Sequence, residues 1–292
     1  MNTPVADFVR SYAGSGVSRL HMPGHKGQPF LGCEALDITE VQGADALFEA
    51  AGILRESEEH AASLFGAART LYSTEGSSLC IRAMLCLALT CRPAGTDRLI
   101  LAARNVHRSF VYAAALLDLP VRWLWPQAGG SLCSCPVTGE ELDQALSSLP
   151  RPPAAVYVTS PDYLGLMQPI EELAQVCHRH GTLLLVDNAH GAYLHFLPKP
   201  CHPMDLGADL CCDSAHKTLP VLTGGAYLHI SRQAPPAMAS RAKQAMAMFG
   251  STSPSYLTLA SLDLCNGYLA GSYRERLHQA QDQLQAFRLR LQ

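Results

Sequence analysis

The sequence has few charged residues and no concentration of positive charge. Asp, Glu, Lys and Arg make up 16% of its 292 residues, and the formal net charge is −3. Proteins that bind nucleic acid carry a basic stripe or patch, so we do not expect a nucleic-acid partner. The low charge and 48% hydrophobic content also exclude a disordered chain and favour a compact fold with a large core.

Long hydrophobic runs are also missing. The most apolar windows are 79–91, which Arg82 interrupts, and 182–186, and both are far shorter than a membrane span. The first residues, MNTPVADFVRSYAGSG, contain Asp7 and no apolar stretch of the kind found in signal peptides. We therefore expect no membrane association and a cytoplasmic location.

Cysteine is abundant, but the spacing typical of zinc sites is absent. Eleven cysteines occur without a single C-x2-C pair, and most lie in apolar runs, where reduced cysteines act as small hydrophobic residues. The candidate ligands for a zinc site are Cys133, Cys135, Cys211, Cys212, His178 and His180. Such a site is disfavoured, because neighbouring residues of a strand, such as Cys211 and Cys212, face opposite ways. No metal is expected.

Short apolar strands alternate with helices along most of the chain. The predicted strands are 70–73, 98–102, 121–124, 154–158, 183–187, 210–213 and 226–229. The predicted helices include 5–12, 55–67, 77–90, 108–117, 139–147 and 170–180. This alternation predicts a three-layer α/β/α fold with a mostly parallel sheet, whose ligands bind beyond the carboxyl ends of the strands.

We divide the chain into three segments. Residues 1–35 form an N-terminal segment, and 36–235 form the large α/β domain. A Pro-bearing stretch, 231–239, closes that domain, and a helical region follows from about residue 240. Because the sequence stops within a predicted helix, we expect 236–292 to be a helical linker and the start of an incomplete small domain.

Two strand-end residues carry the strongest chemical signal. Asp187 ends an apolar strand, and Lys217 follows another shortly after Asp213. An Asp that caps a turn and a solvated Lys are the ordinary interpretations. A partly desolvated Lys, however, is an amine nucleophile toward carbonyls, and pyridoxal phosphate needs a Lys for its Schiff base and an Asp for its pyridinium nitrogen.

Further polar residues are expected at the same sheet edge. The segment TEGSS (74–78) joins a strand to a helix, so Gly76, Ser77 and Ser78 offer a flexible turn, hydroxyls and N-terminal amides to an anion. Such joints are also ordinary helix caps. His107 follows another strand and is positioned to stack on a planar ring, and TSPDYLG (159–165) follows a third.

Eight motifs occur in an order that resembles one family. They are HMPGHKG (21–27), DITE (37–40), GSS (76–78), RNVHRS (104–109), TSPDYLG (159–165), DNAHGA (187–192), SAHKTLP (214–220) and FGSTSPSY (249–256). The sequence resembles the Orn/Lys/Arg decarboxylases, which use pyridoxal 5'-phosphate and have the aspartate-aminotransferase-type fold. The resemblance runs from about residue 3 to residue 270.

The resemblance implies roles for particular residues. Lys217 would be the Schiff-base lysine, Asp187 the pyridinium partner and His107 the stacking residue. The remaining cofactor contacts would come from Gly76, Ser77, Ser78, Ala189, His190, Ser214 and His216. The family also implies a homodimer with shared active sites, in which Thr252 and Ser253 would reach the phosphate bound by the partner subunit.

The implied activity is decarboxylation of arginine, lysine or ornithine. Three features differ from the family pattern: Glu75 stands where Asn usually precedes the phosphate glycine, Thr223-Gly224 replaces the frequent Thr-Gln, and the sequence is shorter. An acid beside a phosphate is repulsive unless it points away. Two alternatives stay open, namely other pyridoxal-phosphate chemistry (transamination or another lyase reaction) and a truncated, non-catalytic protein.

Overall fold

A single seven-stranded sheet forms the centre of the protein. The structure is a computed structural model and describes residues 1–126 and 131–291. The strands are β1 (Arg69–Ser73), β2 (Asp97–Ala103), β3 (Val121–Leu124), β4 (Pro153–Thr159), β5 (Leu183–Asp187), β6 (Leu210–Asp213) and β7 (Ala226–Ile230). Three of them have the predicted bounds, and the other four extend by one or two residues.

The sheet is mostly parallel, as predicted. Its order is β1-β7-β6-β5-β4-β2-β3. The four pairs from β3 to β6 are parallel, whereas β7 runs antiparallel to both of its neighbours. The parallel strands therefore present their carboxyl ends at one common edge, where the predicted site residues follow them.

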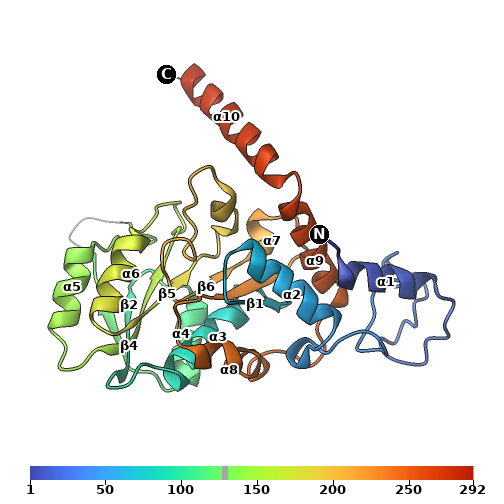
Figure 1. Cartoon of the computed structure of the whole chain (residues 1–292), viewed down its shortest axis with the longest axis horizontal. Coiled ribbons are helices and arrows are strands. Elements are labelled where there is room, and N and C mark those ends of the chain that lie inside the picture. The colour runs from blue at the N-terminus through green and yellow to red at the C-terminus, as the bar shows by residue number, and fades with distance from the viewer. Residues whose placement is uncertain (127–130, 292) are drawn as a thin grey trace.

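Helices cover both faces of the sheet. They are α1 (Pro4–Gly14), α2 (Ile53–Leu64), α3 (Gly76–Thr90), α4 (Arg108–Leu116), α5 (Gly139–Ser147), α6 (Ile170–Arg179), α7 (Ala215–Thr218), α8 (Pro236–Ala247), α9 (Tyr256–Ala270) and α10 (Tyr273–Leu291), with short 3-10 helices at Leu47–Glu49 and Ala192–Phe196. One face packs against α3, α4 and α8. The other packs against α5 and α6 near β4 and against α2 and α9 near β1 (Figure 1).

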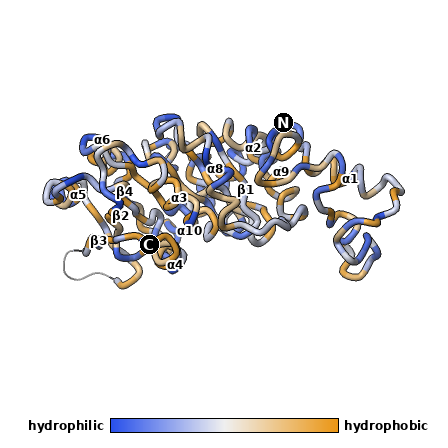
Figure 2. The backbone as a smooth tube through the Cα atoms, turned by 90° about the horizontal axis from the view of Figure 1, so that it is seen from below, coloured by the Kyte–Doolittle hydropathy of each residue, from blue (hydrophilic) through white to orange (hydrophobic). Residues whose placement is uncertain are grey.

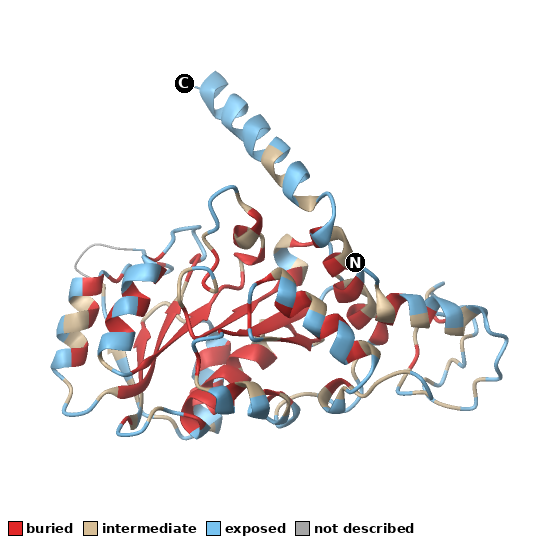
Figure 3. Ribbon diagram, viewed as in Figure 1, coloured by how far each residue is buried: buried red, intermediate tan, exposed pale blue. Residues whose placement is uncertain are grey.

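The apolar composition of α3 and β5 explains why they lie at the centre. Eleven of the fifteen residues of α3 are buried, and all five of β5 are buried. A helix that is apolar on all sides and a strand covered on both faces are what a three-layer core requires. Figure 2 shows hydrophobic residues along α3, and Figure 3 shows that α3 and the strands are the buried layer.

The C-terminal part divides between core and surface. Helix α8 begins at Pro236, a few residues before the predicted helical region, because Pro is favoured in the first turn of a helix. Met238, Ala242 and Met246 of α8 belong to the same buried cluster as α3. Helix α10 has no buried residue and projects away from the body (Figures 1 and 3). Within the described ranges, no helix is both long and apolar enough to cross a membrane.

Candidate active site

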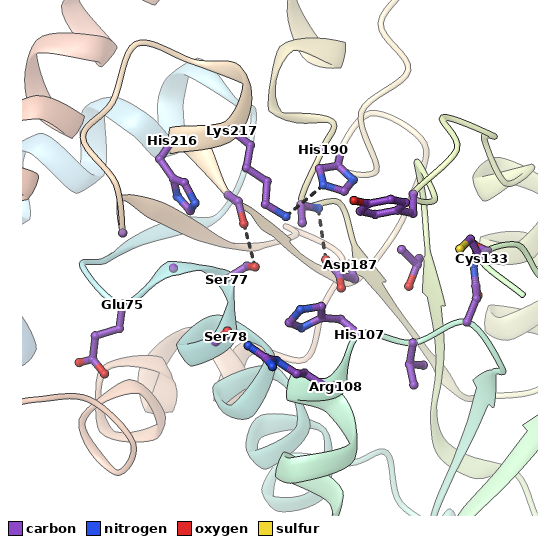
Figure 4. A pocket seen from close by; sticks show the side chains of 18 of the residues that line it. Glu75, Ser77, Ser78, His107, Arg108, Cys133, Asp187, His190, His216 and Lys217 are labelled. Carbon is purple, nitrogen blue, oxygen red and sulfur yellow. Dashed lines mark hydrogen bonds between the residues drawn. The ribbon is translucent and has the colours of Figure 1, made fainter.

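A cavity of about 680 Å³ opens at the carboxyl edge of the sheet. Ten predicted site residues line it: Gly76, Ser77, Ser78, His107, Asp187, Ala189, His190, Ser214, His216 and Lys217. They come from loops that follow β1, β2, β5 and β6, so the shared strand polarity brings together residues far apart in sequence (Figure 4). The volume lies within the range of cofactor and small-molecule sites.

Asp187 lies at the floor of this cavity with few hydrogen-bond donors around it. Its side chain is buried, and it accepts hydrogen bonds from Tyr157 Oη at 3.3 Å and from the Ala189 amide at 3.2 Å. The Cys212 thiol is a weaker third donor, 3.7 Å away. Burial raises the pKa of Asp187, more than these donors and the nearby cations lower it. The carboxylate is therefore short of positive charge.

Lys217 reaches into the same cavity from α7. Its Nζ donates a hydrogen bond to His190 Nε2, 3.0 Å away (Figure 4). Burial, followed by the charge of Lys217, lowers the pKa of His190, so its Nε2 is an acceptor for this hydrogen bond. The prediction of a partly desolvated Lys217 is wrong for this chain, because its side chain is exposed.

The first turn of α3 presents a group of hydrogen-bond donors, which we call the α3 cradle. The amides at a helix N-terminus have no partner within the helix, and the helix dipole adds positive potential there. Ser77 and Ser78 lie at this turn, and the Ser214 hydroxyl donates to Ser77 Oγ at 2.8 Å. Three hydroxyls and the helix terminus thus converge, which is the donor set that a phosphate requires.

Two glycines allow the cradle to form. Gly76 has a φ of +70°, and its amide donates to Gly224 O at 2.7 Å. Gly224 has a φ of +94°, and a Cβ there would lie 2.4 Å from the Thr74 carbonyl oxygen. The loop after Lys217 can therefore dock on the turn before α3 only with glycine at position 224. This close approach gives a structural reason for the departure from Thr-Gln.

His107 is the N-cap of α4, and its ring is held by hydrogen bonds. Its Nδ1 accepts from the Ser109 amide at 3.2 Å, which leaves the ring proton on Nε2. The Ser109 hydroxyl lies 2.9 Å from the same Nδ1 and donates to Ser78 Oγ at 2.8 Å. The imidazole is thereby tied to the cradle, and the ring is exposed to the cavity.

Glu75 points away from the cradle, which removes the expected repulsion. Its Oε1 accepts a hydrogen bond from the Ser251 amide at 2.6 Å, and Figure 4 shows its side chain directed away from Lys217. This bond brings 251–253 close to the start of α3 in the same chain. Thr252 and Ser253 are exposed and do not line the cavity of their own chain.

Several residues that contribute to the site were not predicted. Arg104 and Arg108 border the cavity, as do Thr159 and Cys133. Both arginines belong to the RNVHRS motif that follows β2, so their place in that motif is a usable signal. Cys133 belongs to the segment 131–134, whose carbonyls Arg104 holds, and no sequence pattern indicates that contact.

The TSPDYLG segment divides between cavity and loop. Tyr163 lines the cavity. Ser160 and Asp162 do not: Ser160 Oγ accepts from the Gln168 amide, and Asp162 Oδ1 accepts from the Leu164 and Leu166 amides. These two side chains stabilise the turn that carries Tyr163.

Two known proteins of similar sequence are named as an uncharacterised protein and as an arginine decarboxylase. The chain is 31% identical to the "Uncharacterized protein YaaO" of Bacillus subtilis over 92% of its own length and 57% of that protein. It is 31% identical to the "Arginine decarboxylase" of Halalkalibacterium halodurans, over 97% of this chain and 60% of that protein. The chain thus spans less than two thirds of these relatives.

Solved structures show the same fold. Lysine decarboxylase A from Pseudomonas aeruginosa aligns with a TM-score of 0.80 and 22% identity, over 98% of this chain and 42% of that one. A serine palmitoyltransferase from Sphingomonas wittichii aligns with a TM-score of 0.60 and 16% identity, over 94% of this chain and 61% of that one. Residues 3–291 match the family described as Orn/Lys/Arg decarboxylase, major domain, and the chain therefore belongs to that family.

Proposed function

We propose that this chain binds pyridoxal 5'-phosphate and, within a homodimer, decarboxylates a basic amino acid. The observation that carries the proposal is the convergence of Lys217, Asp187 and the α3 cradle on one cavity. A nucleophilic amine, a buried carboxylate short of cations and a dianion site are the three features that this cofactor requires.

The residues present fit the phosphate, the ring nitrogen and the two ring faces of the cofactor. Ser77, Ser78 and Ser214 would hold the phosphate together with the free amides of α3. Asp187 would face the ring nitrogen, whose positive charge supplies what the buried carboxylate lacks. His107 would lie against one face of the ring. Ala189, which also lines the cavity, would pack on the other.

The chemistry divides between the cofactor and the chain. Bound pyridoxal phosphate would supply the electron sink for the carbanion that remains when carbon dioxide leaves. Lys217 would hold the cofactor covalently through Nζ and be displaced by the substrate amine. His190 Nε2 accepts a hydrogen bond from Lys217 Nζ at 3.0 Å and would orient the amine during that exchange. Asp187 would keep the ring nitrogen protonated.

Binding is tested by reduction of the loaded protein. The full chain incubated with pyridoxal 5'-phosphate should develop a visible absorption band, and borohydride should then attach the cofactor to Lys217. The chain has four lysines, Lys26, Lys199, Lys217 and Lys243, so peptide mass spectrometry identifies the site without ambiguity. Lys217→Arg should abolish labelling, and Lys199→Arg, at an exposed position, should not. Labelling at another lysine contradicts the assignment.

Activity is tested by the product. Release of carbon dioxide from carboxyl-labelled arginine, lysine or ornithine supports decarboxylation and identifies the substrate. Formation of a keto acid supports the aminotransferase alternative, and bound cofactor without turnover supports a non-catalytic protein.

We also propose a cytoplasmic location, which the unpaired state of all eleven cysteines supports.

A further inference from the structure

A closed cluster of polar side chains surrounds Asp213, the last residue of β6. Its Oδ1 accepts from Asn188 Nδ2 at 2.6 Å, and its Oδ2 accepts from His202 Nε2 at 3.0 Å and from His229 Nε2 at 3.1 Å. All four residues are fully buried. None of them lines the candidate active site, so the cluster has no assigned role.

The cluster lies on the face of the sheet opposite Asp187. Asp187 pairs with Cys212 across β5 and β6, and the Cys212 thiol contacts its carboxylate, so these two side chains share a face. Side chains alternate along a strand, and Asp213 therefore faces the other side. Asn188 is the residue after Asp187, so its side chain likewise faces the side opposite Asp187. The Asn188–Asp213 bond thus joins the residue after Asp187 to the residue before Ser214.

The cluster places one carboxylate between two imidazole rings. The Met204 amide donates to His202 Nδ1 at 3.2 Å, so the His202 proton lies on Nε2, where Asp213 accepts it. Burial lowers the pKa of His229, whose Nε2 also donates to Asp213. The two imidazoles hold the pKa of Asp213 well below its usual range against the opposing effect of burial. A buried carboxylate with three donors is stable as an anion.

A metal ion is a poor occupant of the cluster. Ligand atoms of His202, Cys211 and Asp213 lie within 4.8 Å of one another. A metal on His202 Nε2 would move the ring proton to Nδ1, where the Met204 amide already donates, and two donors would then oppose each other. Burial also raises the pKa of Cys211 well above its usual value, which favours the thiol over the thiolate ligand.

We propose that Asp213 is a positioning residue for the active site. The β5–β6 ladder ends where the Asp187 and Lys217 loops diverge, since only Leu185–Asp187 pair with Leu210–Cys212. Beyond the ladder, the Asn188–Asp213 bond is a direct side-chain link between the two loops, and His229 extends it to β7. Asp213 would thereby set how Ser214 and Lys217 lie relative to Asp187. This inference rests on the proposed cofactor function.

The test replaces the carboxylate by an amide of the same shape. Asp213→Asn places an NH2 group against buried donors from the imidazoles or Asn188, so the cluster must rearrange. We expect the dissociation constant of pyridoxal 5'-phosphate, measured by absorbance titration, to rise about tenfold, as for supporting residues behind other sites. The pH midpoint of the visible band should shift too, because the distance between Lys217 and Asp187 changes.

Asp263→Asn is the matched control. Asp263 is also a buried carboxylate that accepts several hydrogen bonds, from the Val5 and Ala6 amides and from the Ser57 hydroxyl, but it does not line the cavity. It should leave the dissociation constant and the pH midpoint unchanged at a temperature at which circular dichroism shows every variant folded. Asn188→Ala removes one donor to Asp213 and should weaken binding to a smaller extent.

The outcomes separate the two levels of the proposal. Equal effects of Asp213→Asn and Asp263→Asn, with an unchanged midpoint, refute the positioning role alone. If Asp213→Asn does not fold, Asn188→Ala decides: weaker binding with a shifted midpoint supports the role, and wild-type behaviour refutes it. A wild-type chain that develops no visible band refutes the proposed function and this inference with it.

Discussion

Replacing Asp187 by Asn tests the central charge pair of the proposed site. The side chain keeps its shape but loses the negative charge that would hold the cofactor's ring nitrogen protonated. In the structure this carboxylate is buried, and burial raises its pKa, so its charge is poorly screened by solvent. The mutation should therefore change the electronic state of the cofactor much more than the position of the ring.

Elementary electrostatics gives the size of the effect. Two unit charges about 4 Å apart at an effective dielectric constant of about 20 attract by about 4 kcal/mol. That energy equals about three pKa units for the ring nitrogen. The protonated fraction at neutral pH then falls up to about a thousandfold, and the turnover number should fall by two to three orders of magnitude, roughly as for loss of other buried electrostatic groups.

The assay separates binding from chemistry. Asp187→Asn should still be labelled at Lys217 after borohydride reduction, because the amine and the α3 cradle are intact. Carbon dioxide release should drop, and Asp187→Glu should recover part of it by restoring the charge. Full activity of Asp187→Asn would mean that Asp187 is only a turn residue and would refute the reasoning.

Three further predictions concern the turn, the pH dependence and assembly. Gly224→Ala should weaken cofactor binding and destabilise the fold by about 1–3 kcal/mol, because its Cβ would meet the Thr74 carbonyl oxygen; Gly95→Ala, with a similar φ but open space, controls for backbone strain in thermal melts. His178 has a raised pKa because it donates a hydrogen bond to Asp209, so His178→Asn should lower the melting temperature at pH 6. The loss in the free energy of unfolding should stay below about 1 kcal/mol, because the pair is partly exposed. This loss should become smaller as the pH rises through the raised pKa of His178. Sedimentation should show that cofactor increases the dimer fraction if 252–253 reach the partner's phosphate; a monomer that binds cofactor tightly contradicts the shared site.

The sequence predicts the framework well because its signals are local. Apolar runs bounded by Gly or Pro correspond to all seven strands. Asp187 ends β5, and Lys217 lies on α7, which directly follows β6. The parallel order then brings them to one edge without further information. These features depend on hydrophobic periodicity and strand polarity alone.

The parts that sequence reasoning missed depend on contacts between distant loops. Glycine is required at position 224 only because its loop lies against Thr74. Glu75 does not repel an anion in the cradle only because its carboxylate accepts a hydrogen bond from the Ser251 amide and points away. The exposure of Lys217 likewise depends on how the distant segments that line the cavity are arranged around it. No pattern within a window of neighbouring residues contains these distances, so only the folded chain reveals them.

The two buried carboxylates at this edge of the sheet have different partners, and this difference supports the proposed role of Asp187. Asp213 has three strong donors, from Asn188 and two histidines, and its pKa lies well below the usual range. Asp187, on the other face, has one hydroxyl, one amide and a weak thiol, and its pKa is raised. Environments that push the pKa values of neighbouring acids apart indicate different roles. Asp213 is already satisfied within the fold, whereas under our proposal Asp187 gains a cationic partner only when the cofactor enters the cavity beside it.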